Sequence, residues 1–167
     1  VNATQLNTLD NNTTGGIDIS SVQTITGSCS ELKIAYTSNG ISGLGNKAII
    51  LTDTTGSASD LRTLDAVTIG TINASSITTI TGLIADINYA YTSNHITGKG
   101  NEAITLSDTT ITATQLNTLD NNTIGSIDAS TVMTITGTVA DINEAYASNG
   151  ITGLGNEAVT IIDTTLG

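Results

Sequence analysis

Apolar side chains recur along the chain in two alternating patterns. In stretches such as 112–120 they stand three positions apart, whereas in stretches such as 103–106 (AITL) apolar and polar or small side chains alternate. The first pattern predicts short amphipathic helices, and the second predicts half-buried strands. The helices are expected at 2–10, 28–36, 57–65, 83–91, 112–120 and 138–146.

Two kinds of strand are expected between these helices. In the stretch 127–135 (IDASTVMTI), and in its counterparts at 17–25 and 72–80, apolar residues take the first, third, sixth and ninth positions. This spacing predicts a strand, a corner and a second strand. A later strand, at 103–106 in the middle repeat, has one buried and one exposed side.

Asparagine and glycine mark the bends. The dipeptides at 39–40 and 149–150 are Asn-Gly, which is expected to form a turn with positive φ. The middle repeat has Asn94-His95 here, and His also tolerates positive φ. Glycine pairs follow each turn and predict a tight bend or a close backbone approach. These pairs are Gly43/Gly45, Gly98/Gly100 and Gly153/Gly155.

The same elements return with a fixed 55-residue period, so that Tyr36, Tyr91 and Tyr146 are equivalent. The stretch YTSNGISGLGNKAIILTDTT at 36–55 recurs as YTSNHITGKGNEAITLSDTT and as YASNGITGLGNEAVTIIDTT. A period of this size is typical of stacked repeats that share one continuous core. We therefore expect one continuous solenoid with repeats at 1–55, 56–110 and 111–165, and the start of a further repeat at 166–167.

Each repeat is itself double. Leu116 aligns with Ile142 later in the same repeat and with Ile87 in the repeat before it. The predicted fold is therefore an α/β solenoid, in which each half-repeat contributes one helix and short parallel strands. Packed helices need about 8–10 Å and paired strands only about 4.8 Å. The helical side should be the wider one, and the stack should curve or twist.

The half-repeat alignment defines two rows of equivalent helix positions. One row holds Lys33 and Arg62 among asparagines, and we expect it to be exposed because Lys and Arg are rarely buried unpaired. The other row alternates Asp with Tyr. Its members either form charge-assisted hydrogen bonds between neighbours or are solvated Asp beside half-buried Tyr. This inter-repeat ladder consists of Asp10, Tyr36, Asp65, Tyr91, Asp120 and Tyr146.

Composition and charge narrow the class of protein. Hydrophobic residues make up 38% and aromatic residues 2% of the chain, which suits thin, repeated aliphatic layers. The net charge is −11, from 15 acidic and 4 basic residues. Nucleic acids and anionic membranes attract basic proteins, and no run approaches the roughly 18 apolar residues of a membrane span. We therefore expect no nucleic acid partner and no membrane insertion.

Few residues are suited to chemistry. His95 is the only histidine and occupies a turn position, and Cys29 is expected to be a small buried apolar residue. The acidic residues recur in each repeat, whereas an active site needs an asymmetric constellation. Asp53, Asp108 and Asp163 are expected to bond nearby backbone N–H groups in turns. The sequence therefore predicts no enzyme activity, no catalytic residue and no cofactor.

Three kinds of ligand or modification stay open. Calcium suits an acidic solenoid, and the candidate ligands are Asp10, Asp18 and Asp128. The Thr-Ile-Thr triplets suit ice binding, but the alignment places them on alternate coils, whereas a flat ice-binding face needs them on every coil. Candidate glycosylation sites in Asn-X-Ser/Thr sequons are Asn2, Asn11, Asn12, Asn73 and Asn121.

The stretches GITGLGNEAVTIIDTT, TATQLNTLD and TVADINEAY resemble the repeats of very large bacterial surface proteins, notably cyanobacterial ones. The resemblance covers the whole chain and implies a secreted structural or adhesive array, without catalytic residues. The expected function is therefore that of a structural protein in an extracellular fibre, stalk or surface layer. The alternatives are an adhesin module that binds calcium or glycan repetitively, and an ice-binding solenoid.

The regularity of the first and third repeats bears on the partners. Leu6 and Ile17 are in register with later repeats, and no capping repeat is recognisable. Uncapped solenoid ends expose apolar layers and unpaired strand edges. We therefore expect the partners to be copies of the chain, or adjoining repeats of a longer chain, stacked end to end in contacts that propagate without closing.

Overall fold

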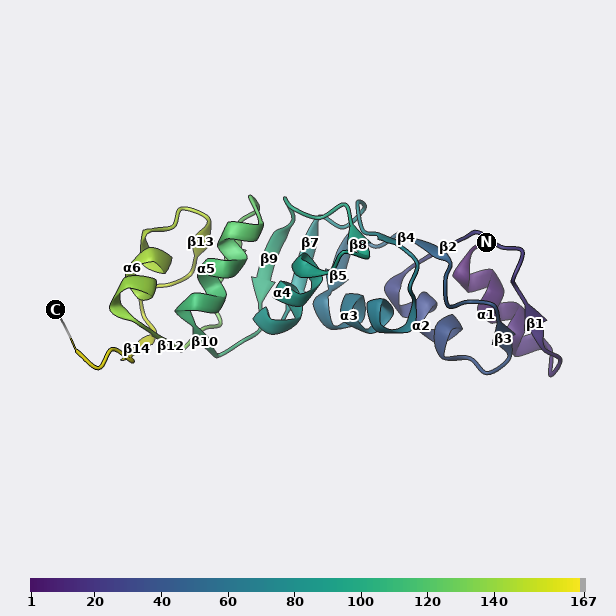
Figure 1. The fold of residues 1–167 in the computed structure, drawn as a ribbon, viewed down its shortest axis with the longest axis horizontal. Coiled ribbons are helices and arrows are strands. Elements are labelled where there is room, and N and C mark those ends of the chain that lie inside the picture. Colours follow the sequence, from purple (N-terminus) through teal and green to yellow (C-terminus); the bar gives the residue numbers. More distant parts are fainter. Residues whose placement is uncertain (166–167) are drawn as a thin grey trace.

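The structure, a computed structural model, describes residues 1–165. The molecule is elongated, and its helices follow one another along the long axis in chain order, with the two ends of the chain at opposite ends (Figure 1). The fold is an α/β solenoid, as the sequence predicts. The helices are α1 (Ala3–Asn12), α2 (Cys29–Thr37), α3 (Ala58–Val67), α4 (Ile84–Thr92), α5 (Ala113–Asn122) and α6 (Val139–Ala147).

Short strands connect the helices, and every strand pair is parallel. One helix with the strands that follow it forms one coil of the solenoid. The strands are β1 (Ile17–Asp18), β2 (Thr24–Gly27), β3 (Ile41–Ser42), β4 (Ala48–Leu51), β5 (Thr55–Ser57), β6 (Ile72–Asn73), β7 (Thr79–Gly82), β8 (Ile96–Thr97), β9 (Ala103–Leu106), β10 (Thr110–Thr112), β11 (Ile127–Asp128), β12 (Thr134–Gly137), β13 (Ile151–Thr152) and β14 (Ala158–Ile161).

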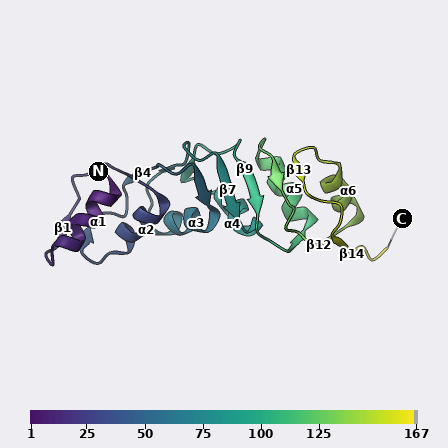
Figure 2. The same cartoon turned by 180° about the vertical axis from the view of Figure 1, so that it is seen from behind.

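The sheets are staggered along the axis. The longest sheet has five strands in the order β13-β11-β9-β7-β5, and the next has four in the order β2-β4-β6-β8. In each, a central strand (β9 or β4) pairs on one side with a strand that precedes a helix and on the other with a strand that follows a helix. Each sheet therefore crosses the solenoid diagonally. The view from behind shows β7 and β9 side by side in front of the helices (Figure 2).

Repeated aliphatic layers form one continuous core. Leucines from the helices, such as Leu61 and Leu116, meet isoleucines from the strands, such as Ile80 and Ile104, and all four are buried. The chain has no Phe or Trp, and the layers need none because each is only one coil thick. Stability in such an array comes from contacts within a coil and between adjacent coils.

Capping follows the sequence in most helices. The sequence places Ser or Thr three residues before Glu, Gln or Asp at four helix starts, a pattern that predicts capping boxes. The boxes at 28–31 and 112–115 are both present, and at 138–141 the Thr hydroxyl accepts the backbone N–H bond. At 57–60 no box forms, and the Asp60 carboxylate binds the Lys33 ammonium at 2.5 Å instead.

The expected geometry of the Asn-Gly turns is also wrong. Gly40 and Gly150 lie outside the positive-φ region, and residues 1–165 contain no non-glycine residue with positive φ, His95 included. At these glycines an aspartate carboxylate occupies the space of a side chain, whereas the middle repeat accommodates His95 at the equivalent position, 3.2 Å from Asp65. A Cβ at Gly40 would lie 2.1 Å from an Asp10 carboxylate oxygen, and one at Gly150 would lie 2.4 Å from an Asp120 oxygen.

The glycine pairs behave as predicted at their first members. Gly43, Gly98 and Gly153 have φ of +81°, +78° and +82°, a region that favours glycine. A Cβ at Gly98 would also lie 2.8 Å from the backbone nitrogen of Ser75 on the preceding coil. Both the tight bend and the close backbone approach are therefore confirmed.

Candidate functional site

Aspartates near the end of a coil cap the helix that begins the same coil. Each carboxylate accepts a hydrogen bond from the first N–H of a helix 24 residues earlier in the chain. The expectation of bonds to nearby turn N–H groups is therefore wrong. A carboxylate at a helix N-terminus also interacts favourably with the helix dipole. The bonds join Cys29 to Asp53, Ile84 to Asp108 and Val139 to Asp163, at 2.8, 2.7 and 2.8 Å.

Asp108→Ala should lower the free energy of unfolding by about 1–2 kcal/mol, because the first N–H of α4 loses its partner and the helix loses a favourable charge. Urea unfolding followed by far-UV circular dichroism measures the change. Thr109→Ala, at an exposed neighbouring position, should change this free energy by less than about 0.5 kcal/mol. Equal unfolding curves for the two variants would show that the cap contributes nothing.

The first row of helix positions links each helix to the next. The amide of Asn7 donates to the Glu31 carbonyl at 2.9 Å, and Asn117 donates to the Asp141 carbonyl at 2.9 Å. Arg62 binds the Asp86 carboxylate at 2.7 Å. The expectation of an exposed row holds for Arg62 but is wrong for Asn117, which is buried. The amide is short enough to lie between two helices and reach a carbonyl in the first turn of the second.

The second row does not form the predicted Tyr-to-Asp ladder. Asp10 and Asp120 accept bonds from the hydroxyls of Ser38 and Ser148, at 2.7 and 2.8 Å. The tyrosines turn the other way, along their own coil. Tyr36 donates to the Leu44 carbonyl, Tyr91 to Glu102 and Tyr146 to Glu157. The turn that follows a helix is therefore held from two sides, by the Asp of the preceding coil and by the Tyr at the end of that helix.

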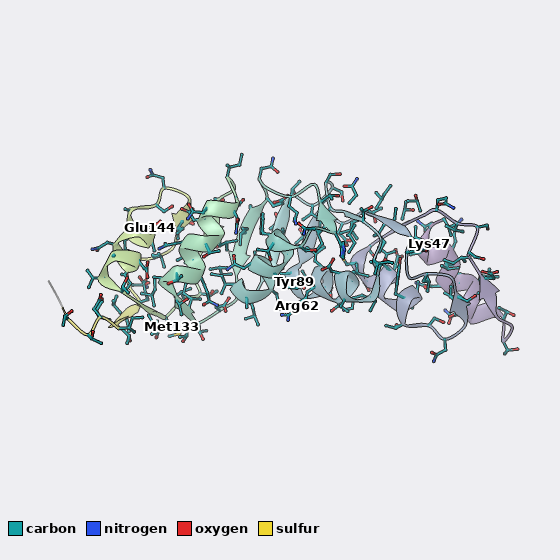
Figure 3. The ribbon with its side chains drawn as sticks, in the orientation of Figure 1. Lys47, Arg62, Tyr89, Met133 and Glu144 are labelled. Carbon is teal, nitrogen blue, oxygen red and sulfur yellow. The ribbon has the colours of Figure 1, made fainter. Side chains whose placement is uncertain are left out.

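The middle repeat carries an asymmetric cluster around Asp65. This buried carboxylate accepts bonds from Ser93 at 3.1 Å and from Tyr89 at 2.7 Å, and it lies 3.2 Å from Nδ1 of His95. The Arg62 guanidinium lies 5.0 Å from the centre of the Tyr89 ring, and the two labelled side chains lie together in Figure 3. Because Ser93 donates to the carboxylate rather than to His95, the cluster braces the turn and does not present an activated hydroxyl.

Lys99 and Glu102 extend this polar network. The Lys99 ammonium donates to the carbonyls of Ala90 and Ser93 at the C-terminal end of α4, at 2.6 and 3.1 Å. Glu102 is buried and accepts bonds from the Tyr91 hydroxyl and the Gly100 N–H. Burial lowers the pKa of Lys99 and raises that of Tyr91. The network thus fixes the turn between α4 and β9.

The basic groups are all engaged, so the acidic groups dominate the surface. Lys33 and Arg62 pair with carboxylates, whereas Lys47 and Lys99 donate to backbone carbonyls. The third repeat has no Lys or Arg and six acidic residues. One of them, Glu144, is exposed on α6 (Figure 3). This arrangement favours solubility and repels other anionic surfaces.

Cys29 is buried, as predicted. Its positions in the next repeats hold Ile84 and Val139, so the site is built for an apolar side chain. Burial, helped by the carboxylates of Asp53 and Asp60, raises the pKa of the thiol from 9.0 to about 12.

Stability should therefore fall in alkaline solution, in part through Cys29. Above pH 9 the unfolded thiol loses its proton while the folded thiol keeps it until about pH 12, so each pH unit costs at most about 1.4 kcal/mol. Urea unfolding at pH 8 and at pH 10.5 should show a smaller loss for Cys29→Val, because valine cannot ionise. Equal losses in the two proteins would contradict this.

The calcium candidates are separate from one another in the structure. Asp18 accepts bonds from the hydroxyl and the backbone N–H of Ser20, and Asp128 accepts one from the backbone N–H of Ser130 at 3.0 Å; these bonds lower the pKa values of both carboxyl groups. Asp10 binds Ser38. Within the described chain no three His, Cys, Asp or Glu side chains gather in a way that would hold a metal ion. Calcium binding stays a prediction from the sequence.

The glycosylation candidates differ in access. Asn11, Asn12 and Asn121 are exposed at the C-terminal ends of α1 and α5. Asn2 and Asn73 are half-buried and in use, because Asn2 caps α1 and Asn73 accepts the Ser75 N–H at 3.0 Å. The three exposed residues are therefore the better acceptors.

Rows of hydroxyl groups run across the sheets from coil to coil. In adjacent strands β10 and β12, Thr110 lies beside Thr134 and Thr112 beside Thr136. Strands β5 and β7 repeat this arrangement one repeat earlier. The half-repeat alignment did not show these neighbours, because β5 and β10 were not recognised as strands. On the other side of β7 and β12, Ala103 and Ala158 take the place of the first threonine, so a complete Thr-X-Thr pair does not occur on every strand.

The two end faces differ from the interior at equivalent positions. At the N-terminal end Leu9 is 51% exposed, although its counterparts Leu64 and Leu119 are fully buried. At the C-terminal end Ile161 is 43% exposed, although Leu106 is buried. Each end thus presents apolar side chains that an adjacent coil covers elsewhere in the chain.

Residues 1–165 enclose no pocket, and none of their helices is long and apolar enough to cross a membrane. Among the described residues, the end faces are where apolar positions that are buried elsewhere in the array are exposed. Exposed ends are expected from the sequence, but the residues that form them are not. The available signal was Gly15, because all three repeats have glycine at this register. Searches against known protein families, curated proteins and solved structures found no match.

Proposed function

We propose that the chain is a structural module of an extracellular fibre, stalk or surface layer, in which stacked coils form a stiff, acidic rod. Its partners are adjoining modules, and it acts by extending the rod rather than by catalysis. The observation that carries this proposal is that each coil covers the next in the same way. Consecutive helices pack in chain order from α1 to α6, and the strands of consecutive coils pair in parallel.

Two further features support a spacer role. The core is continuous along the whole array, so bending at any coil would break contacts between layers. The surface is acidic because the basic groups are held in internal bonds, which would keep neighbouring rods apart.

Covalent tandem arrays test this proposal. Copies joined so that Thr165 is followed directly by Val1 preserve the repeat period. Small-angle scattering should show a length that rises in proportion to the number of copies at constant cross-section, and thermal stability should rise with copy number. Compact or freely jointed particles would refute the rod. Electron microscopy of native material should show filaments with an axial repeat set by the module.

Ice binding is the second candidate, and the hydroxyl rows favour it. The Thr-X-Thr pairs of β10 and β12 lie in register, and Thr55 and Ser57 lie beside Thr79 and Thr81, where parallel strands repeat at about 4.8 Å. Measurement of thermal hysteresis tests this candidate. Thr136→Lys, between Thr112 and Thr160 in one row, should abolish any hysteresis, whereas Thr63→Lys on the exposed helical side should leave it unchanged. A wild-type chain without hysteresis removes this candidate.

A further inference from the structure

Gly15 has no structural reason to be glycine within a single copy of the chain. A Cβ at Gly15 would meet only the Thr13 hydroxyl, at an ordinary 3.4 Å. Its equivalents are Gly70 and Gly125, where a Cβ would lie 2.0 Å from the carbonyl oxygen of Lys47 or Glu102 on the preceding coil. Glycine at this register therefore serves close contact with a preceding coil.

The interior shows what this contact looks like. Just before Gly125, the Thr123 hydroxyl and the Ile124 N–H both donate to the Gly100 carbonyl, at 3.2 and 2.9 Å. The Ile104 N–H donates to the Ser126 carbonyl at 2.8 Å. The junction around Gly70 repeats all three bonds one repeat earlier.

The two ends of the chain carry the two halves of this junction. On the N-terminal face, Thr13, Thr14 and Gly16 are exposed at the positions that donate and accept these bonds. On the C-terminal face, Gly155 and Val159 are exposed at the positions of Gly100 and Ile104. The apolar side chains of Leu9 and Ile161, buried at equivalent places inside the array, flank the two halves.

We infer that the C-terminal face of one copy of this chain binds the N-terminal face of a second copy, and that β14 pairs there in parallel with β1. The register follows from the interior, where Ile104 pairs with Ile127 and Thr105 with Asp128. Val159 therefore pairs with Ile17, and Thr160 with Asp18. The contact is heterologous, so copies add in one direction without closing. This inference rests on the proposed function and specifies its partner.

Sedimentation velocity of the full chain tests the association. Because each copy carries a net charge of −11, association should strengthen as salt screens the repulsion. In high salt the wild-type mass should rise above 16.9 kDa with concentration. Gly15→Ala should raise the dissociation constant by about tenfold or more, since the methyl group of the alanine would overlap a backbone carbonyl of the neighbouring copy. Gly45→Ala, in an exposed loop away from both end faces where a Cβ meets nothing within 4 Å, should associate like wild type.

Disulfide trapping tests the register. In a Cys29→Val background, Asp18→Cys with Thr160→Cys places two thiols at opposite ends of one chain, so only separate copies can be linked. Directly paired strand positions are close enough for a disulfide, and oxidation should give a ladder of oligomers. Ser20→Cys with Thr160→Cys, two residues out of register, should give at least about tenfold less product.

The outcomes separate the two proposals. A wild-type chain that stays monomeric at high salt and millimolar concentration overturns the inference, as does a Gly15→Ala variant that associates like wild type. Neither result affects the rod, which covalent tandem arrays test independently. Gly15→Ala should keep the wild-type melting temperature when dilute, so loss of association cannot be misread as unfolding.

Discussion

Gly125→Ala is expected to lower the free energy of unfolding by about 3 kcal/mol or more. The new Cβ would lie 2.0 Å from the carbonyl oxygen of Glu102 and 2.6 Å from its carbon. These are backbone atoms just before β9, which is paired on both sides, so they cannot move aside as a side chain would. The α5 coil must shift away from its neighbour. Urea unfolding followed by circular dichroism at micromolar concentration measures the loss.

Gly16→Ala is the matched control for this substitution. It makes the same chemical change in the equivalent loop, but its Cβ meets nothing within 4 Å. We expect a change of less than about 0.5 kcal/mol, because alanine also restricts the unfolded chain and so offsets part of any loss. If Gly125→Ala and Gly16→Ala unfold alike, close approach between coils is not what requires glycine.

Leu106→Ala is expected to destabilise the chain by about 2–5 kcal/mol, the range for removing a large aliphatic side chain from a packed core. Leu106 is 1% exposed, at the end of β9, and the coils on both sides enclose it. The cavity would lie in the middle of the array, where the surrounding layers cannot close around it. Urea unfolding again gives the free energy.

Ile161→Ala tests the same position one repeat later. It removes the same number of carbon atoms, but Ile161 is 43% exposed and already partly in water. In dilute solution we therefore expect a loss below about 1.5 kcal/mol, the lower limit for a fully buried aliphatic side chain. The difference between the two variants isolates the contribution of the following coil. Equal losses would show that β14 is covered in solution in a way the monomer does not show.

The sequence was sufficient for the architecture because the period and the apolar pattern are redundant. Leucines at every third position recur in each repeat, and the unequal spacing of the half-repeats matches the starts of α1, α2 and α3. Three equivalent observations of each element leave little room for a wrong assignment. The buried side of β9 followed from simple alternation, and its burial pattern confirms it.

The contacts between distant residues were harder to predict, because no local motif connects the residues that they join. Asp108 looks like a turn residue in the sequence, yet its carboxylate reaches the first N–H of α4, 24 residues earlier in the chain. Strand β5 (Thr55–Ser57) has a glycine at its centre and is very short, so propensity gives it no signal. Without β5, the diagonal sheets and the adjacent threonine rows stay hidden.

The candidate site shows the same division. The Asp-Tyr row was found correctly as a row, but its partners were assigned to the wrong coil. Tyr91 prefers Glu102 on its own coil, because the turn after α4 folds back over the helix end. Asp65 instead accepts hydrogen bonds from the hydroxyls of Ser93 and Tyr89. Side-chain direction, which the alignment of positions does not contain, decides between these partners.

The staggered sheets have a mechanical consequence. Between α2 and α3 the chain is bridged by both β4-β6 and β5-β7, and between α4 and α5 by both β9-β11 and β10-β12. One sheet begins along the axis before the previous sheet ends, so that the two overlap at these junctions. Tension along the axis at these junctions is therefore shared by two hydrogen-bonded ladders, so rupture requires both to yield together and no single sheet end is a point of weakness.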